Sequence, residues 1–239
     1  MKKLLLLVLA VICFAPCTQI AAMEHSTTQN IPNNQIWYTS SDGNVVTPNK
    51  TYYVFGATIK SNTYSNGKGV ITFDGDVTMI GDEAFYNCDK LTSVTLPESV
   101  ASIGKKAFYD CDGLTEFTIP DSVTTIGYEA FYKCTSLTSV KIGDSVTTIG
   151  YFAFSSCTSL TSVNIPDSVT SIGERAFSWC TRLTSVYCKA TTPPALGDTN
   201  VFYDNGSGRK IYVPAESVDA YKSTYRWSKY KSAIVGYDF

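Results

Sequence analysis

The chain repeats itself every 23 residues, and this internal repeat limits its fold more than any other feature of the sequence. Four columns of apolar or cysteine residues step by that interval. They are the isoleucines Ile80, Ile103, Ile126, Ile149 and Ile172, the phenylalanines Phe85, Phe108, Phe131, Phe154 and Phe177, the cysteines Cys88, Cys111, Cys134, Cys157 and Cys180, and the leucines Leu91, Leu114, Leu137, Leu160 and Leu183. A unit of this length cannot bury its own apolar face, so neighbouring units must stack. The repeat therefore predicts a solenoid.

One repeat contains two short extended segments and a turn. Residues 91–96 end in an alternation of apolar and polar side chains, which is typical of a strand that faces a core on one side. Pro97 ends that strand, because proline cannot donate to a β ladder. Residues 100–103 form a second extended stretch, and Gly104 permits the backbone to reverse. Residues 105–111 are too few for a stable isolated helix, so we expect one helical or 3₁₀ turn that places Phe108 in the core.

Degenerate copies of the unit extend the array at both ends. The first turn is expected to start near Lys68, since the apolar residues within 71–77 lie one period before those within 94–100. A sixth turn contains Phe202 and ends at Pro214, with two extra residues near Pro193 and Pro194. The repeat array is therefore expected to cover residues 68–214.

The open ends of a solenoid expose apolar surface, so the flanking segments should be caps. Residues 23–67 are expected to form an N-terminal β cap, in which a hairpin turning at residues 41–44 joins residues 36–39 to 45–46. Residues 215–239 are expected to form a C-terminal helical cap. Its helix would cover residues 215–225, with Pro214 at its first position. The side chains expected to close the core are Val218, Tyr221, Tyr225, Trp227 and Ile234.

The first 22 residues have the pattern of a secretory signal peptide. Lys2 and Lys3 precede an apolar run over residues 4–15, and small residues end the segment at Ala22. The run is shorter than the ~20 residues that a membrane-spanning helix needs, and nothing later is long enough. We therefore expect an exported protein, extracellular or on the outer cell surface, without a spanning segment. Lipid anchoring through Cys17 is a less favoured alternative, because the residues before it do not match a lipoprotein signal.

Composition and charge exclude several classes of function. Nineteen bases against 21 acids give a net charge of −2, which does not fit a nucleic-acid-binding protein. His25 is the single histidine, so a His-rich metal site is excluded and most acid–base catalysis lacks its usual base. No G-x-S-x-G, H-E-x-x-H or phosphate-loop motif occurs. We expect a protein that is not an enzyme and that uses no cofactor or metal.

The cysteine column has three possible interpretations. Stacked strands lie ~4.7–4.9 Å apart, a separation that would allow disulfides in an exported protein. Stacked side chains point in the same direction, however, and five thiols cannot all pair within one column. No C-x-x-C motif supports a zinc site. A buried column of small apolar thiols is the favoured interpretation.

Two further columns have both a structural and a functional interpretation. Tyr86, Tyr109 and Tyr132 predict a stabilising surface ladder, and a sugar-binding platform is the alternative. The triplet Asp-Ser-Val, which starts at positions 121, 144 and 167, predicts a turn in which Asp and Ser bond to the local backbone. The same triplet resembles a bacterial O-glycosylation acceptor.

The repeat unit L-x-x-V-x-I/L-P-x-S-V-x-x-I-G-x-x-A-F-x-x-C resembles the BspA-like class of leucine-rich repeats over residues 68–214. The resemblance implies an α/β fold: a right-handed, β-rich leucine-rich-repeat solenoid in an exported or surface protein. Some members of that class are adhesins. We therefore expect an exported binding module that adheres to a host matrix protein or to other cells. A cell-envelope glycan-binding protein is the alternative, and the oligomeric state stays open.

The outward-facing strand column is the candidate ligand surface. It contains Thr95, Thr118, Lys141, Asn164 and Tyr187, and it should lie on the concave sheet. The column becomes more distinctive towards the C-terminus, where Tyr, Trp and Arg side chains can supply interface energy. Neutral variation of exposed positions is the alternative explanation. We predict that Lys141, Asn164, Arg182 and Tyr187 line the ligand surface and that Trp179 lies at its edge.

Overall fold

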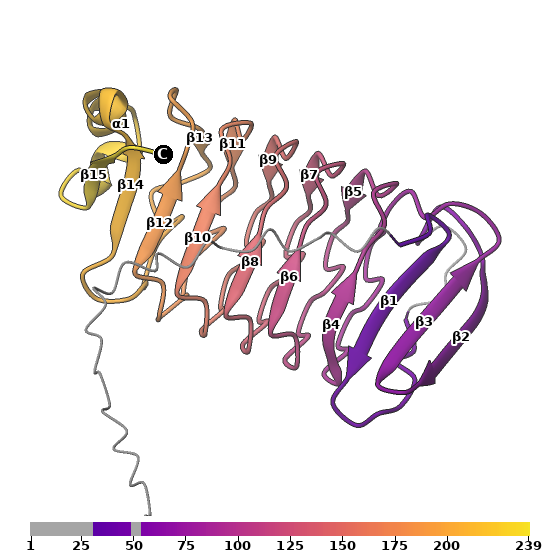
Figure 1. The fold of residues 1–239 in the computed structure, drawn as a ribbon. Coiled ribbons are helices and arrows are strands. Elements are labelled where there is room, and N and C mark those ends of the chain that lie inside the picture. The colour runs from indigo at the N-terminus through magenta and orange to yellow at the C-terminus, as the bar shows by residue number, and fades with distance from the viewer. Residues whose placement is uncertain (1–30, 49–53) are drawn as a thin grey trace, which may run out of the picture.

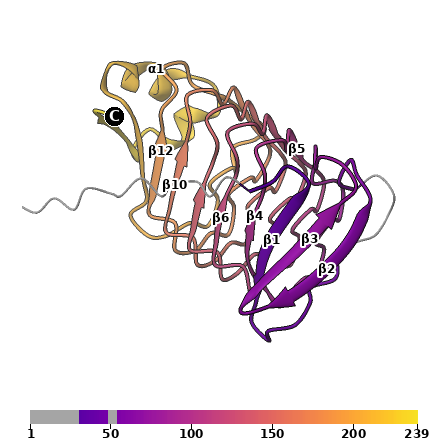
Figure 2. The same ribbon diagram turned by 45° about the vertical axis from the view of Figure 1, so that its right-hand side comes forward.

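In the computed structural model, which describes residues 31–48 and 54–239, the chain winds into a solenoid of stacked turns (Figures 1 and 2). The predicted signal peptide, Cys17 and His25 lie outside these residues. One parallel sheet has six strands in the order β15-β14-β12-β10-β8-β6, and a second has five in the order β13-β11-β9-β7-β5. The expectation of a parallel solenoid with 23-residue repeats is confirmed.

The turns from β6 to β13 each contribute one strand to each of these two sheets. The strands of the six-stranded sheet are β6 (Glu116–Thr118), β8 (Ser139–Lys141), β10 (Ser162–Ile165), β12 (Ser185–Cys188), β14 (Lys210–Pro214) and β15 (Ile234–Tyr237). Those of the five-stranded sheet are β5 (Ser102–Ile103), β7 (Thr125–Ile126), β9 (Thr148–Ile149), β11 (Ser171–Ile172) and β13 (Ala195–Leu196). Val163 pairs with Val186 and Ile126 pairs with Ile149, so the register between turns equals the sequence period.

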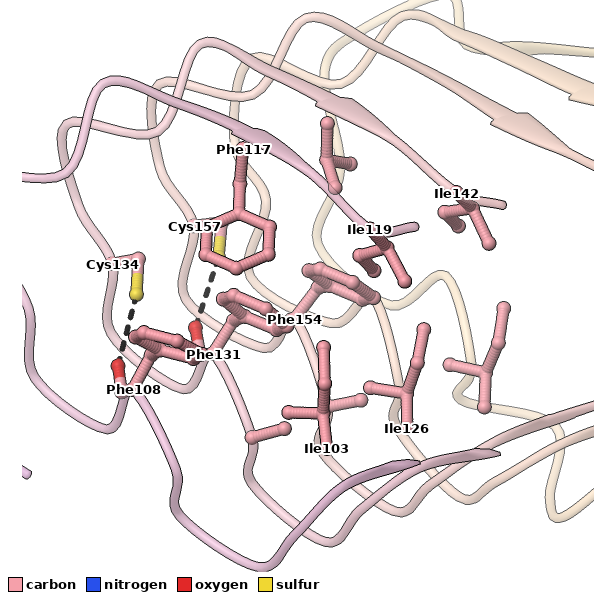
Figure 3. Close-up of a cluster of buried hydrophobic side chains, with 14 of the residues drawn as sticks. Ile103, Phe108, Phe117, Ile119, Ile126, Phe131, Cys134, Ile142, Phe154 and Cys157 are labelled. Atoms are coloured by element: carbon pink, nitrogen blue, oxygen red, sulfur yellow. Dashed lines mark hydrogen bonds between the residues drawn. The ribbon is translucent and has the colours of Figure 1, made fainter. Parts of the chain in front are cut away.

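The apolar columns fill the space between the sheets, as the repeat predicts. Every member of the isoleucine, phenylalanine and leucine columns is at most 1% exposed. The phenylalanine rings stack nearly parallel, with centroid distances from 5.0 Å for Phe131 and Phe154 to 5.7 Å for Phe177 and Phe202. Figure 3 shows this stack beside thiols that point at backbone carbonyls of the preceding turn. Phe202 continues the column, which confirms the sixth turn.

The third side of the solenoid is not the helical or 3₁₀ turn expected for residues 105–111. The N–H of Tyr109 donates to the carbonyl of Lys106, and Lys106 and Asp110 have positive φ of 55° and 57°. Turns with a residue in this left-handed region cannot continue a helix. The N–H of Phe108 instead donates to Ala130 of the next turn at 2.7 Å. Along this side, backbone amides bond alternately within their own turn and to the next turn. These hydrogen bonds offset the backbone strain at Lys106 and Asp110, which have positive φ without being glycine.

The glycine after each isoleucine serves a close approach between turns. A Cβ on Gly127 would lie 2.5 Å from the carbonyl carbon of Gly104, and a Cβ on Gly150 would lie 2.5 Å from the carbonyl oxygen of Gly127. Their φ angles are not in the left-handed region, so the expected role in reversing the backbone is wrong. The glycines are required because adjacent turns touch through their backbones.

The N-terminal cap is an antiparallel sheet with the strand order β2-β3-β1-β4. Its strands are β1 (Gln35–Ser40), β2 (Ile59–Ser65), β3 (Lys68–Phe73) and β4 (Leu91–Thr95). The hairpin expected between residues 36–39 and 45–46 does not form, because β3 and β4 occupy both edges of β1. The hairpin of the cap joins β2 to β3 through Asn66 and Gly67, whose φ angles of 51° and 77° fit a two-residue turn.

This arrangement also corrects the expected start of the first turn near Lys68. Strand β3 is antiparallel to β1 and is separated from β4 by it, so β3 is not a first parallel strand. Stacking begins later. Ile80 makes a parallel bridge to Ile103, and the N–H of Ala101 donates to the carbonyl of Thr78.

The C-terminal cap contains η1 (Ala215–Ser217), α1 (Val218–Ser223), η2 (Trp227–Tyr230) and β15. Tyr221, Trp227 and Ile234 are buried as expected, and Val218 packs partly buried against the core. Tyr225 is 80% exposed, so its place in the cap core is wrong: the helix ends at Ser223 and Thr224 is extended. Pro214 has ψ 135° and belongs to β14, so it precedes the helical segment instead of starting it.

Polar side chains of this cap bond to backbone carbonyls of the last turn. The hydroxyl of Tyr221 donates to the carbonyl of Ala190 at 2.7 Å, and the indole N–H of Trp227 donates to Pro194 at 2.7 Å. Further donors of this kind are Arg226 to Leu196 and Tyr230 to Thr199. The cap therefore covers the last turn with rings and satisfies its backbone at the same time.

Candidate functional site

Three of the predicted site residues form one row across the outward face of the six-stranded sheet. Asn164 pairs in register with Lys141 on one side and with Tyr187 on the other. Lys141 and Asn164 are exposed and Tyr187 is half-buried. Inward neighbours such as Val163 and Val186 are at most 1% exposed, so the alternation expected of these strands holds. The row continues beyond the prediction to Tyr212, which pairs with Tyr187.

The C-terminal end of this row is an aromatic cluster, formed by Tyr187, Tyr212, Tyr237 and Phe239. The rings of Tyr187 and Tyr212 stack with centroids 4.7 Å apart at 13°. Tyr237 packs edge-on against both rings, at 5.5 Å and 5.6 Å, and Phe239 packs against Tyr237 at 5.1 Å. Tyr237 and Phe239 remain 44% and 52% exposed. Four rings held by one another on a sheet form a rigid surface that can bury large apolar area on a partner.

The sequence prediction missed Tyr212, Tyr237 and Phe239. Tyr212 could have been found, because the two-residue insertion places it 25 positions after Tyr187 in the same column. Tyr237 and Phe239 could not be found in this way, since Tyr237 is the last residue of β15, a strand outside the repeat pattern, and Phe239 follows that strand. Their position depends on the pairing of β15 with β14.

The other two predicted residues lie elsewhere. Trp179 is on the third side of the solenoid, with φ 55°, where its ring packs edge-on against Tyr203 at 6.0 Å and beside the guanidinium of Arg175. Arg182 is exposed on the turn that leads into β12. Among the described residues, no hydrogen bond, ion pair or ring contact joins either of them to the row Lys141, Asn164 and Tyr187. Of the five predicted site residues, only Lys141, Asn164 and Tyr187 therefore lie together on the sheet face.

Charge on the outward sheet face changes sign along the solenoid. Side chains that point outward from β8, β10, β12 and β14 include the bases Lys141 and Lys210 and no acid. Glu116 on β6 is the acid at the N-terminal side. At the far end of the same face, Trp37 pairs opposite Thr95 and is covered by the ammonium of Lys68, 2.9 Å from the ring centroid. The face of β8 to β14 is thus weakly basic, and Asp238, between Tyr237 and Phe239, adds an exposed acid beside the aromatic cluster.

The tyrosine column on the third side is a stacked ladder, as its structural interpretation predicts. Tyr86 and Tyr109 stack at 4.9 Å, and Tyr109 and Tyr132 stack at 5.1 Å. Lys106 lies 5.2 Å from the ring centre of Tyr109. The column then changes to Ser155, whose buried hydroxyl is 3.0 Å from that of Ser178. Because the ring faces are occupied by one another, this ladder offers little open ring surface to a sugar.

The Asp-Ser-Val turns are structural turns, but their Asp and Ser side chains bond to neighbouring turns of the solenoid and not to the local backbone as expected. The hydroxyl of Ser122 donates to the carbonyl of Val100, and the hydroxyl of Ser168 donates to that of Val146, both at 2.7 Å. The N–H of Asp144 donates to a carboxylate oxygen of Asp121 at 3.1 Å. Glycosylation at these turns stays a prediction.

The cysteine column is buried, which confirms the favoured interpretation for four of its five members. Cys111, Cys134, Cys157 and Cys180 are fully buried and unpaired, and Cys88 at the first turn is half-buried. Burial raises the pKa of the Cys180 thiol to about 12, and it raises the pKa of Cys88 to about 11. Such thiols are protonated and unreactive at neutral pH. Within the described residues, no group of three His, Cys, Asp or Glu side chains could hold a metal.

In the part of the chain that the structure describes, no helix has both the length and the apolar character needed to cross a bilayer.

A family model described as "BspA type Leucine rich repeat region" matches the chain in six copies, over residues 57–184 and 101–231. The chain belongs to this leucine-rich repeat family. The family match covers both parallel sheets except β15, the third side and most of the C-terminal cap. Leucine-rich repeat solenoids are typically binding scaffolds without enzymatic activity. A search among curated proteins found no match.

Several solved structures are similar to the chain. A leucine-rich repeat protein from T. pallidum is 40% identical, with a TM-score of 0.45, and the match covers 48% of this chain and 55% of that one. One from Bacteroides ovatus is 24% identical, with a TM-score of 0.44, over 68% and 52%. The pneumococcal vaccine antigen PcpA is 18% identical, with a TM-score of 0.49, over 74% and 46%. The chain thus spans about half the length of these three structures.

Proposed function

We propose that this protein is an exported protein-binding module that acts at the cell surface in adhesion, through the outward face of its six-stranded sheet. The observation that carries the proposal is the aromatic cluster next to the row Lys141, Asn164 and Tyr187. Tyrosine, tryptophan and arginine most often dominate the energy of protein interfaces. An aromatic group that is already packed also loses little side-chain entropy when a partner binds.

The charges and hydroxyls around the cluster define the partner surface that it fits. Lys141 and Lys210 are the charged groups that point outward from β8 to β14, and Ser139, Ser162 and Ser185 form the row that Lys210 continues. A partner with an apolar anchor and a weakly acidic rim would complement this face. Tyr187 and Tyr212 cover one another at 4.7 Å, so the site does not offer the two open ring faces that a sugar-binding platform would use. A protein surface is therefore the favoured partner, either on host matrix or on other cells.

Export and adhesion rest on the signal-like segment at residues 1–22 and on membership in the BspA-type family. A rigid solenoid suits such a role, because its surface is large for its mass and it is held by short-range contacts between neighbouring turns.

The experiment is a binding screen of the mature chain from residue 23 on an array of purified matrix proteins and on an array of glycans. The variant Lys141→Ala/Tyr187→Ala should fold normally and bind the selected matrix protein at least about tenfold more weakly, since hot-spot truncations often cost ~2 kcal/mol or more. The matched control, Tyr86→Ala/Tyr109→Ala, removes two stacked tyrosines from the third side and should bind as the parent does.

Two results would overturn the proposal. If the control loses binding while the sheet variant keeps it, the tyrosine ladder is the binding site. If the chain selects only glycans, and the sheet variant abolishes that selection, the alternative of a cell-envelope glycan-binding protein replaces a protein partner.

A further inference from the structure

The two ends of the solenoid are closed in different ways. At the N-terminal end, β1 pairs with β4, and the outer edge of that sheet is β2. Strand β2 carries Lys60 and an irregular register between Ile59 and Ser61, which are common devices against edge-to-edge pairing. At the C-terminal end, the last strand of the six-stranded sheet is β15, with the sequence Ile-Val-Gly-Tyr. This strand has no charge and no proline, and no register irregularity interrupts its pairing with β14.

One edge of β15 has unpaired backbone groups. The N–H of Ile211 donates to the carbonyl of Ala233 at 2.9 Å, and Ile211 pairs in register with Ile234. In a parallel pair, alternate residues of a strand bond to the same neighbour. Val235 and Tyr237 therefore bond to β14, whereas the amides and carbonyls of Ile234 and Gly236 point away from it. In the described residues these groups have no backbone partner.

We propose that this edge pairs with the same edge of a second copy of the chain, antiparallel across a two-fold axis at Gly236. That register makes a hydrogen-bonded pair of the two Gly236 residues. It also sets Val235 opposite Tyr237 of the second copy, and Tyr237 opposite the second copy's Val235. Pairs of β-branched and aromatic side chains at directly opposite positions are favourable.

The exposed side chains of the strand favour a second copy as the occupant. Val235 and Tyr237 are 37% and 44% exposed on the outward face, and both would be partly covered by the symmetric strand. A Cβ at position 236 would point into its own chain, 3.2 Å from the Cα of Ala215, and not towards a strand paired along the edge. The edge is thus complementary to itself, as a two-fold interface requires.

The dimer would join two six-stranded sheets and place two aromatic clusters on one continuous face. Two short strands bury less area than a standard permanent interface. The dimer is therefore reversible, and the fraction of chains in it increases with protein concentration. On a surface that displays many ligands, two linked sites would bind more tightly than one. The dimer itself does not depend on the proposed function, because the pairing needs no ligand.

Sedimentation of the mature wild-type chain without ligand, over a range of concentrations, tests the pairing. We expect a monomer–dimer equilibrium. Gly236→Pro removes both amide donors at the axis and should weaken the dimer at least about tenfold. Gly236→Ala keeps the amide and is the matched control, which should still dimerise. A wild-type chain that stays monomeric at every concentration, or a Gly236→Pro variant that dimerises like Gly236→Ala, would overturn the proposal.

Amide exchange in the wild type gives a second readout that needs no substitution. The amide of Gly236 should exchange slowly at high protein concentration and rapidly on dilution. The amide of Val235, which bonds to β14, should stay protected at both concentrations. If the exchange rate at Gly236 does not depend on concentration, a second copy does not occupy the edge. Ligand binding by monomeric Gly236→Pro is measured separately, so failure of the dimer and failure of the proposed function can be told apart.

Discussion

The thiol of Cys134 donates a hydrogen bond of 3.1 Å to the carbonyl oxygen of Phe108, which lies 26 residues earlier in the chain. The same bond recurs between other turns. Cys111 donates to Phe85, Cys157 to Phe131 and Cys180 to Phe154, at 3.0–3.2 Å. In the sixth turn the side-chain amide of Asn205 replaces the thiol and donates to Phe177 at 2.7 Å. The thiols are thus second donors to the carbonyls of Phe85, Phe131 and Phe154, which also accept the backbone N–H of the cysteine three residues later. For the carbonyl of Phe108, the thiol of Cys134 is the one donor among the described residues.

Removal of one such donor should destabilise the fold. We expect Cys134→Ala to lower the free energy of unfolding by about 1–3 kcal/mol, because the carbonyl of Phe108 loses its partner in a dry core. Cys88→Ala is the matched control: Cys88 is half-buried and has only two weak contacts, at 4.0 Å. It should change stability by less than about 0.5 kcal/mol. Urea unfolding measures the stability change of both variants, provided that the m-value stays unchanged. Equal changes for the two variants would show that the bond from Cys134 to Phe108 does not stabilise the fold.

Buried thiols should resist modification in the folded protein. In the mature chain at pH 8, Cys111, Cys134 and Cys157 should not react with a thiol reagent, while all six described cysteines should react after denaturation. Reductant should leave the melting temperature unchanged, because the column contains no disulfide. A large fall in melting temperature on reduction would mean that the thiols pair.

The raised thiol pKa values predict a loss of stability at alkaline pH. Burial raises the pKa of Cys180 to about 12, whereas the unfolded thiol titrates near its ordinary value of 9.0. Stabilisation is complete below pH 9 and falls between pH 9 and about 12, because there the unfolded chain has released a proton that the folded chain retains. Each such thiol contributes a slope of ~1.4 kcal/mol per pH unit.

Cys180→Ala should reduce that slope by the share of one thiol. Unfolding free energies of parent and variant from pH 7 to 11 measure the difference, which should be constant below pH 9 and shrink above it. Parallel curves over the whole range would contradict the assignment of the pKa shift to Cys180.

The phenylalanine stack should contribute most at its centre. Phe131 is fully buried between Phe108 and Phe154, so Phe131→Ala should cost about 3–5 kcal/mol. Phe152 lies on the third side, only partly buried, and Phe152→Ala should cost less than half as much. Denaturant unfolding of the two variants makes the comparison, and a similar cost for both would show that the stack adds little beyond local packing.

The C-terminal cap should depend on its side-chain donors as well as on its rings. Tyr221→Phe keeps the ring but removes the donor to the carbonyl of Ala190, and we expect a loss of about 1–3 kcal/mol. Tyr225→Phe is the control at an exposed position and should be neutral. Deletion of residues 215–239 should expose the last turn and cause aggregation. A deletion variant that stays soluble and melts cooperatively would show that the cap is dispensable.

The repeat array could be predicted from the sequence because the same short pattern of apolar residues, Pro, Gly and Cys recurs in each 23-residue repeat. The 23-residue period determined which residues face the core, the parallel register and the stacked columns of Phe and Cys. The outward position of Lys141, Asn164 and Tyr187 followed from the same alternation. The Asn66-Gly67 pair was also a readable hairpin signal, because two consecutive residues with positive φ favour these residue types.

Features outside the repeat were decided by tertiary structure alone. Thr39 of β1 pairs with Ser93 of β4, 54 residues away, and no local pattern specifies which edge a strand will cover. The six-residue length of α1 and the exposure of Tyr225 depend on where the cap meets the last turn. Tyr237 reaches the cluster only because β15 pairs with β14. By itself the sequence determined the stacked repeats of the protein, since every repeat packs against the same residue types in its neighbours. The two caps and the aromatic cluster depend instead on contacts between segments that do not repeat, and only the tertiary structure shows these contacts.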